Sequence, residues 1–194
     1  MNLLHLFDLS LVGRRDTAAL DFIGSDDRRE SRTFGEIEDS SNRLAHVLAD
    51  RGFTRGDRLC LQLPNSVEFI ELFLACIKLG VIFVPINILY REREVEHIVR
   101  DAGPKALIGA GELPDLVRAA ASSGSRPRPP VSLEGDTSAA IVYTSGTTGA
   151  SKGAVLTHNN FAVNGLNLIV CWQISHVDRL LLPLPFERKR CAHV

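Results

Sequence analysis

Apolar residues along this chain recur at two spacings, which alternate from residue 33 to residue 121. Recurrence every three or four residues is typical of helices with one buried face, whereas short runs of branched and aromatic residues are typical of buried strands. Helices are predicted between Thr33 and Gly52, between Ser66 and Gly80, from Glu92 to Arg100 and from Leu113 to Ala121. Strands are predicted over residues 58–63, 81–84 and 105–108. This order indicates an α/β fold with layered, mainly parallel sheets covered by helices.

Local signals mark several ends of these elements. Thr33 stands three residues before Glu36, which is the spacing of a capping box at a helix start. Ser66 is suited to cap the next helix, and Gly80 supplies a residue that accepts the left-handed conformation at its end. Residues 26–29, with the sequence Asp-Asp-Arg-Arg, predict a polar turn between two strands.

A change of pattern after residue 121 suggests a boundary within the chain. Residues 122–130 contain three prolines and no apolar period, as expected of a linker or surface loop. A strand is predicted again over residues 139–143, a returning strand over residues 153–156, and a helix capped by Thr157 that runs through Ile169. We therefore expect an N-terminal α/β subdomain over residues 1–121, a linker over 122–138 and the start of a second α/β subdomain over 139–194.

The segment from Tyr143 to Gly153 is the strongest candidate for chemistry. Its glycines permit positive φ and close approach of the backbone to a ligand, and successive amides can form an anion-binding nest. Hydroxyl groups add hydrogen-bond donors, and one lysine adds a positive charge suited to phosphate oxygens. These groups are Thr144, Ser145, Thr147, Thr148 and Lys152. The segment therefore predicts a grip for a polyphosphate.

The composition of this segment is also compatible with other kinds of loop. Gly, Ser and Thr are common in ordinary surface turns, so the composition alone does not prove a ligand site. A Walker A loop needs Gly-Lys followed by Ser or Thr at the start of a helix, whereas Lys152 follows Ser151 and precedes Gly153. The GxGxxG fingerprint of dinucleotide-binding proteins is absent too. Placement between two predicted strands favours a phosphate loop of a different kind.

Composition narrows the remaining classes of function. A formal net charge of -1 gives no basic footprint for nucleic acid. The four cysteines are far apart, without the spacing of a zinc or dithiol site, and suggest reduced thiols. The N-terminus lacks the basic leader of a secretory signal, and no apolar stretch is long enough to span a membrane. We expect a cytoplasmic protein without a nucleic-acid partner, and its oligomeric state stays open.

Residues throughout the chain carry a resemblance to a known superfamily. Thr144-Ser145-Gly146-Thr147-Thr148-Gly149, followed by Lys152-Gly153 and Leu156-Thr157-His158, resembles the core motif of adenylate-forming enzymes, a group that includes acyl-CoA synthetases. Further segments are similar to that superfamily's N-terminal region, namely Thr33–Glu36, Gly56–Arg58, Leu63–Ser66, Ala75–Gly80 and Val84–Asn87. Ser151 and the segment from Asn167 through Trp172 to Asp178 are most similar to malonyl-CoA synthetases.

The resemblance implies an acid–CoA ligase that uses ATP, Mg²⁺ and CoA and acts on a small carboxylic acid. The carboxylate would attack the α-phosphorus of ATP to give an acyl-adenylate, and the CoA thiol would then displace AMP. The resemblance assigns Lys152 as catalytic and Thr148 as a magnesium ligand. It assigns nucleotide contacts to Thr144, Ser145, Gly146, Thr147, Thr148, Gly149 and Lys152. His158 matches a histidine that relatives carry near this loop, and we expect structural or surface roles for the other histidines and a core position for Trp172.

The chain departs from the family's pattern after Phe186. Relatives continue there with a turn that contains histidine and later supply further nucleotide, metal and lysine segments, none of which occurs in this sequence. We therefore hypothesise that the reading frame shifts or breaks near Phe186. Three hypotheses follow: the N-terminal part of an acid–CoA ligase that is inactive alone, an inactive truncated or frameshifted remnant that retains only a phosphate-binding loop, or a nucleotide-binding module of another kind.

Overall fold

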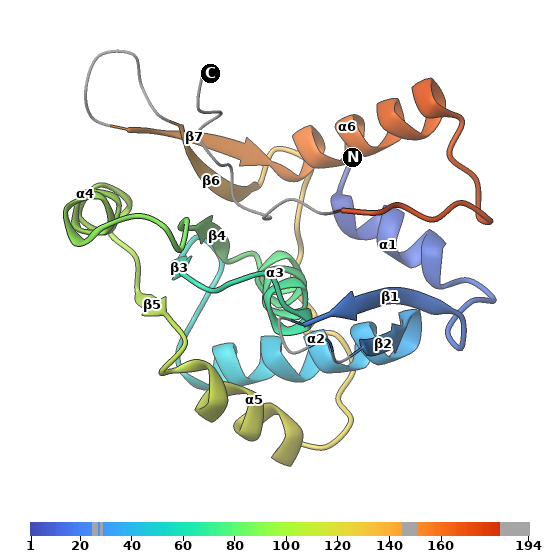
Figure 1. Cartoon of the computed structure of the whole chain (residues 1–194), viewed down its shortest axis with the longest axis horizontal. Coiled ribbons are helices and arrows are strands. Elements are labelled where there is room, and N and C mark those ends of the chain that lie inside the picture. The colour runs from blue at the N-terminus through green and yellow to red at the C-terminus, as the bar shows by residue number, and fades with distance from the viewer. Residues whose placement is uncertain (25–26, 28, 145–150, 183–194) are drawn as a thin grey trace.

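The computed structural model describes residues 1–24, 27, 29–144 and 151–182 (Figure 1). The helices are α1 (Leu3–Leu11), α2 (Phe34–Asp50), α3 (Val67–Leu79), α4 (Glu92–Ala102), α5 (Leu113–Ser122) and α6 (His158–Trp172). The strands are β1 (Ala18–Ile23), β2 (Arg29–Thr33), β3 (Arg58–Leu61), β4 (Ile82–Pro85), β5 (Ala106–Ile108), β6 (Ser138–Thr144) and β7 (Lys152–Thr157). Each helix and strand predicted from residue 33 onward is present, with ends that differ by a few residues.

A five-stranded sheet organises the molecule, with strand order β5-β3-β4-β6-β7. The first four of these strands run parallel, and β7 returns antiparallel to β6. The predicted α/β class with a mainly parallel sheet is therefore confirmed. Because β6 pairs with β4, the sheet continues across residues 122–138, and the predicted division into two subdomains stays a prediction.

The two faces of this sheet are covered by different helices (Figure 1). Alternate residues of a strand point to opposite faces. In β3, Leu59 and Leu61 join the larger core formed with α2, α3 and α5, whereas Cys60 between them joins a second core. That second core includes Ile98 of α4 and Tyr143 of β6, and all the members named here are at most 5% exposed. Helix α4 is thus held against the face on which Tyr143 lies.

Capping residues begin and end the helices where the sequence predicts. The Thr33 hydroxyl accepts from the Glu36 amide at 3.1 Å, and the Glu36 carboxylate accepts from the Thr33 amide at 2.7 Å. The Ser66 hydroxyl accepts from the Phe69 amide at 3.1 Å. Gly80 ends α3 with a φ of 75°, a value that residues with a Cβ rarely adopt. These local signals were sufficient to place α2 and α3.

The first 33 residues add elements outside the sheet. Strands β1 and β2 form an antiparallel pair, as the predicted polar turn between strands requires, although residues 26 and 28 of that turn lie outside the described residues. Helix α1 was not predicted. It packs through Leu3 and Leu4 in a third core that contains Ile77 of α3 and Ala139 of β6, with Phe161 of α6 packed against it.

Three of the four cysteines lie among the described residues. Cys60 and Cys76 are buried and Cys171 is exposed, and all three are free thiols. Burial raises the pKa of the Cys60 thiol to about 12, as expected when an ionised thiolate would lose its hydration. Among the described residues, every helix is too short or too polar to cross a membrane.

Candidate functional site

The predicted phosphate loop joins β6 to β7, and the structure describes its two ends. Thr144 is the last residue of β6 and Lys152 the first of β7, and the two are paired across the antiparallel ladder. Ser145, Gly146, Thr147, Thr148 and Gly149 lie outside the described residues, so their predicted roles stay predictions. The structure thus places the two end residues of the segment, Thr144 and Lys152, side by side on neighbouring strands.

The position of this loop in the sheet suits a ligand. Thr144 lies at the carboxyl end of β6, which runs parallel to β4. Ligands of open α/β sheets bind beyond the carboxyl ends of the parallel strands, where the connecting segments leave a crevice. Lys152 is exposed, and no described side chain forms an ion pair with its ammonium group. The ammonium group of Lys152 can therefore form an ion pair with an anionic ligand.

Two residues of α4 contact the ends of the loop, and the sequence did not single them out. The His97 ring nitrogen Nε2 lies 2.9 Å from the Ser151 carbonyl oxygen. The Tyr143 hydroxyl donates to Asp101 at 2.7 Å. Burial and the nearby Asp101 carboxylate both raise the pKa of Tyr143, so the phenol stays protonated as this donor. His97 belongs to the histidines for which a structural or surface role was expected, and its contact shows which part of the structure it supports.

His158 was expected near the loop, but it lies at the far end of β7. It follows β7 at the opposite end from Lys152, and six extended residues span about 20 Å. The side chain is fully buried, and both ring nitrogens are without a hydrogen-bond partner among the described residues. Burial and the charge of Arg55 lower the pKa of His158, which favours the neutral ring. Its backbone amide donates to the Thr137 carbonyl at 3.0 Å, so His158 supports the start of α6.

The expected core position of Trp172 was wrong. Trp172 ends α6 and is 65% exposed. Ile169 lies three residues before Trp172 on the same side of α6 and is 45% exposed, so the described residues leave this side of the helix largely uncovered. The apolar character of the segment predicted burial, but burial also needs a partner surface.

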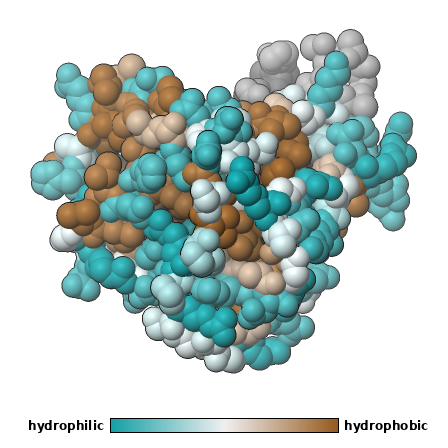
Figure 2. Space-filling model, turned by 180° about the vertical axis from the view of Figure 1, so that it is seen from behind, coloured by the Kyte–Doolittle hydropathy of each residue, from teal (hydrophilic) through white to brown (hydrophobic). Residues whose placement is uncertain are grey.

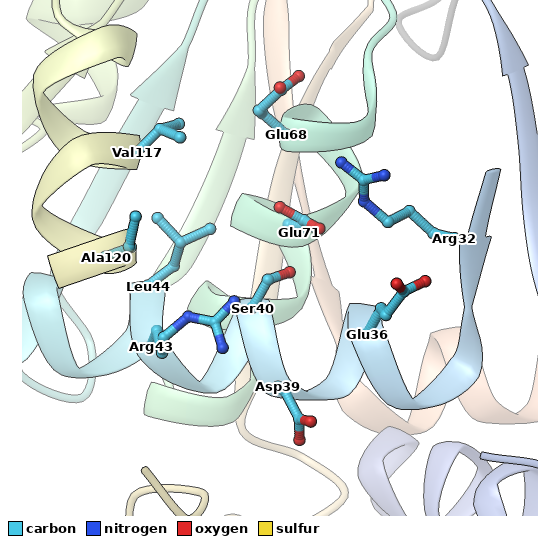
Figure 3. Close-up of a pocket in the computed structure, with 11 residues that line it drawn as sticks. Arg32, Glu36, Asp39, Ser40, Arg43, Leu44, Glu68, Glu71, Val117 and Ala120 are labelled. Atoms are coloured by element: carbon cyan, nitrogen blue, oxygen red, sulfur yellow. The ribbon is translucent and has the colours of Figure 1, made fainter. Parts of the chain in front are cut away.

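A cavity of about 340 Å³ opens far from the loop, between α2, α3 and α5 (Figure 3). Its lining carries both charges, with Arg32 and Arg43 opposite Glu68 and Glu71. In Figure 3 the side chains of Arg32 and Glu71 extend toward one another. Burial raises the pKa of the Glu71 carboxyl group. No described residue of the predicted loop lines this cavity, so it does not form part of the phosphate site.

The family described as AMP-binding enzyme matches residues 7–187, most of the chain. The chain belongs to the AMP-binding enzyme family. The resemblance to adenylate-forming enzymes is therefore confirmed, and a nucleotide-binding module of another kind is excluded.

Relatives within this family include CoA ligases and CoA synthases. The chain is 38% identical over 175 residues to the long-chain-fatty-acid–CoA ligase FadD13 of Mycobacterium tuberculosis, covering 79% of this chain and 35% of the ligase. The inhibitor-bound N-terminal domain of FACL13 from the same organism is 32% identical with a TM-score of 0.78, over 95% of this chain and 51% of that structure. ATP-bound MatB from Rhodopseudomonas palustris is 30% identical with a TM-score of 0.71, over 89% and 38%. The chain thus spans about a third of the full-length ligase.

Proposed function

We propose that this chain is the N-terminal part of an ATP-dependent acid–CoA ligase and that residues 144–152 hold the phosphates of ATP. The observation that carries the proposal is the pairing of Thr144 with Lys152 at the two ends of a loop rich in Gly, Ser and Thr. Hydroxyl groups, backbone amides and one ammonium group match the oxygens of a polyphosphate. The ATP-bound state of the similar MatB structure supports the same choice of nucleotide.

In this proposal the loop residues position phosphates while the substrate carboxylate attacks the α-phosphorus and pyrophosphate leaves. The Lys152 ammonium offsets negative charge on the outer phosphates, and the Thr144 hydroxyl donates to a phosphate oxygen. The hydroxyl-rich composition suits Mg²⁺, a cation that prefers oxygen ligands, and we propose Thr148 as its protein ligand. Bound Mg²⁺ would neutralise charge on the phosphates. CoA is the proposed acceptor of the acyl group.

The proposed substrate class is a carboxylic acid. The similar FadD13 is named for long-chain fatty acids. The segment from Asn167 to Asp178 is the reason to include malonate as well, because it is similar to malonyl-CoA synthetases. Malonate and a long-chain fatty acid differ strongly in charge and apolar area, so a comparison of the two acids is informative.

Nucleotide binding by the 194-residue chain tests the phosphate site directly. We expect MgATP to bind, and Lys152→Ala to weaken its affinity about tenfold, because a charged hydrogen bond is lost. AMP, which lacks the outer phosphates, should bind both forms equally. Lys105→Ala is the matched control, since Lys105 is paired with Asp57 elsewhere on the surface. Isothermal titration measures these affinities, and equal MgATP affinity of Lys152→Ala and the unmodified chain would exclude this role of Lys152.

A second candidate is a remnant that does not catalyse, and the exposed apolar surface favours it. Val170 of α6 and Leu180 and Leu181 of the segment after it are 73%, 79% and 85% exposed, and a stable monomeric domain rarely exposes a large apolar patch. ATP–pyrophosphate exchange with malonate and with long-chain acids measures whether the chain alone forms an acyl-adenylate. We expect no exchange from the chain alone, and acyl-adenylate formation by the purified chain would contradict its expected inactivity.

A further inference from the structure

Helix α4 contacts the residues on both sides of the proposed phosphate loop. His97 and Asp101 are four residues apart in α4, so their side chains lie on the same face of the helix. His97 contacts the Ser151 carbonyl at 2.9 Å, and Asp101 accepts a hydrogen bond from Tyr143 at 2.7 Å. Tyr143 directly precedes Thr144, and Ser151 directly precedes Lys152. One helical turn of α4 is thus fixed to both ends of the loop.

The His97 contact defines which ring nitrogen carries a proton. A carbonyl oxygen can only accept a hydrogen bond, so Nε2 of His97 donates to Ser151. The His97 ring also packs edge-on against the Tyr143 ring, with 6.4 Å between centroids and an angle of 83°. Such edge-to-face contacts are a preferred geometry for aromatic pairs. His97 is therefore oriented by one ring contact and fixed by one hydrogen bond.

A glycine on β7 lets Tyr143 complete this arrangement. Gly153 is the cross-strand partner of Tyr143. A Cβ added at Gly153 would lie 3.1 Å from Cζ of Tyr143 and 2.8 Å from a methyl group of Ile141. The Tyr143 ring thus occupies the space over β7 that a side chain at position 153 would need. Tyr143 contacts both α4 and β7, and the residue is only 5% exposed.

Alternation along the strands places the proposed phosphate contacts on the other face. Thr144 follows Tyr143 in β6, so its side chain points away from α4. Lys152 is the cross-strand partner of Thr144, and directly paired residues share a face. Helix α4 therefore contacts the ends of the loop without occupying the face on which Thr144 and Lys152 lie.

The geometry points to His97 and Asp101 as positioning residues for the phosphate loop, acting through the Ser151 carbonyl and the Tyr143 hydroxyl. This role rests on the proposed binding of ATP phosphates at residues 144–152. Helix α4 is well suited to it, because Ile98 between the two residues is fully buried in the core against β3 and β4. His97 is half-buried and adds a single hydrogen bond. Its hydrogen bond therefore affects the direction of the chain at Ser151 and Lys152 more than the stability of the molecule.

Substitutions of His97 separate positioning from a general effect on stability. We expect His97→Ala to weaken MgATP binding about fivefold, the effect of one neutral hydrogen bond, with little change in the melting temperature. His97→Gln should restore most of the affinity, because its amide can donate to the same carbonyl. His46→Ala is the matched control. The His46 ring nitrogen also contacts a distant backbone carbonyl, that of Pro127 at 2.8 Å, but this contact does not involve the loop. Isothermal titration and thermal unfolding give the two readouts.

Amide hydrogen exchange tests the same role without nucleotide. His97→Ala should speed exchange at the start of β7, whereas His46→Ala should leave β7 unchanged. If the chain does not bind MgATP but shows this change in exchange, the proposed phosphate site is wrong. The support of the loop ends by α4 then still holds. Unchanged exchange in β7 would overturn the positioning role. So would MgATP affinity that His97→Ala leaves intact, or a loss that His46→Ala reproduces.

Discussion

Lys78 shows how a single charge can be held inside this molecule. Its side chain is 1% exposed, and its ammonium group donates to Glu38 at 2.7 Å. The Ser41 hydroxyl and the Asn42 side-chain oxygen accept at 2.6 and 2.8 Å. Arg128 also contacts Glu38, at 3.2 Å, so residues from α2, α3 and the segment after α5 meet here. A buried charge is tolerated when its partners are complete.

Removing this ammonium group should destabilise the chain. We expect Lys78→Met to lower the free energy of unfolding by about 3 kcal/mol, because Glu38, Ser41 and Asn42 lose a buried donor. Lys105→Met is the control, since Lys105 pairs with Asp57 at 2.9 Å on the surface and should change stability by less than about 1 kcal/mol. Urea unfolding measures both, and equal losses would show that burial of Lys78 adds nothing.

The same residue predicts a dependence on pH. Burial lowers the pKa of Lys78 from 10.5 to about 8. Between these values the unfolded chain binds a proton at Lys78 that the folded chain has released, so this residue makes stability rise with pH. The buried thiols of Cys60 and Cys76 oppose this above pH 9, since their raised pKa values keep them protonated only in the folded state. These thiols cancel when wild type and Lys78→Met are compared, and we expect the difference in stability to grow from pH 8 to pH 10 and stay constant below pH 7.

Only some of the residues of the candidate site could be predicted from the sequence. Thr144 and Lys152 could be chosen because a run of hydroxyl groups, glycines and a lysine is visible locally. His97 could not, because its partner Ser151 is 54 residues away and neither the histidine nor its neighbours form a motif. A contact of this kind becomes visible only when the fold brings α4 beside the β6–β7 hairpin.

At the scale of elements, the junction between α1, α6 and the segment before β6 depends on a glycine. The Met1 ammonium donates to the Asn159 side chain at 3.0 Å, and the Asn159 amide donates to the Gly135 carbonyl at 2.7 Å. A Cβ at Gly135 would lie 2.6 Å from the Met1 nitrogen and 3.0 Å from its carbonyl oxygen. No side chain can be added there without moving the start of the chain.

Gly135→Ala should therefore loosen α1. We expect a loss of about 1–2 kcal/mol in the free energy of unfolding and faster amide exchange in α1, because the clash involves backbone atoms. Gly111→Ala is the matched control: nothing lies within 4 Å of its added Cβ, so it should be neutral or slightly stabilising. Equal behaviour of the two variants would show that the N-terminal residue shifts freely.

Helix ends were the features of the fold that the sequence predicted best, and α1 was the helix that it predicted least well. Thr33, Ser66 and Gly80 act through neighbours within a few residues, so the sequence contains the whole signal. Helix α1 has a capping residue too, since the Asn2 side chain accepts from the Leu4 amide at 2.9 Å. Its short apolar run lacks the extended period that identified α2 and α3, and packing against α3 and β6 supplies much of what stabilises it.

At the scale of the whole molecule, apolar side chains gather on one side. Exposed residues there belong to β7, α6 and the segment that follows: Val155, Val163, Ile169, Val170, Trp172, Ile174, Val177, Leu180, Leu181 and Leu182. Figure 2 shows hydrophobic residues at the upper left of the view, over the region of α6. β7 is also the last strand of the sheet and has no strand on its outer edge among the described residues. An exposed edge beside an apolar helix favours association.

We expect the isolated chain to self-associate as its concentration rises, and Val170→Lys to reduce this association. The charge would have to be buried in any contact that covers α6. Leu89→Lys is the control, because Leu89 is 66% exposed but follows β4 at the opposite end of the sheet from α6. Sedimentation velocity measures the association. Trp172 is the one tryptophan of the chain and 65% exposed, so association should also protect its fluorescence from a soluble quencher. If Leu89→Lys reduces association as much as Val170→Lys does, the surface around α6 is not the site of contact.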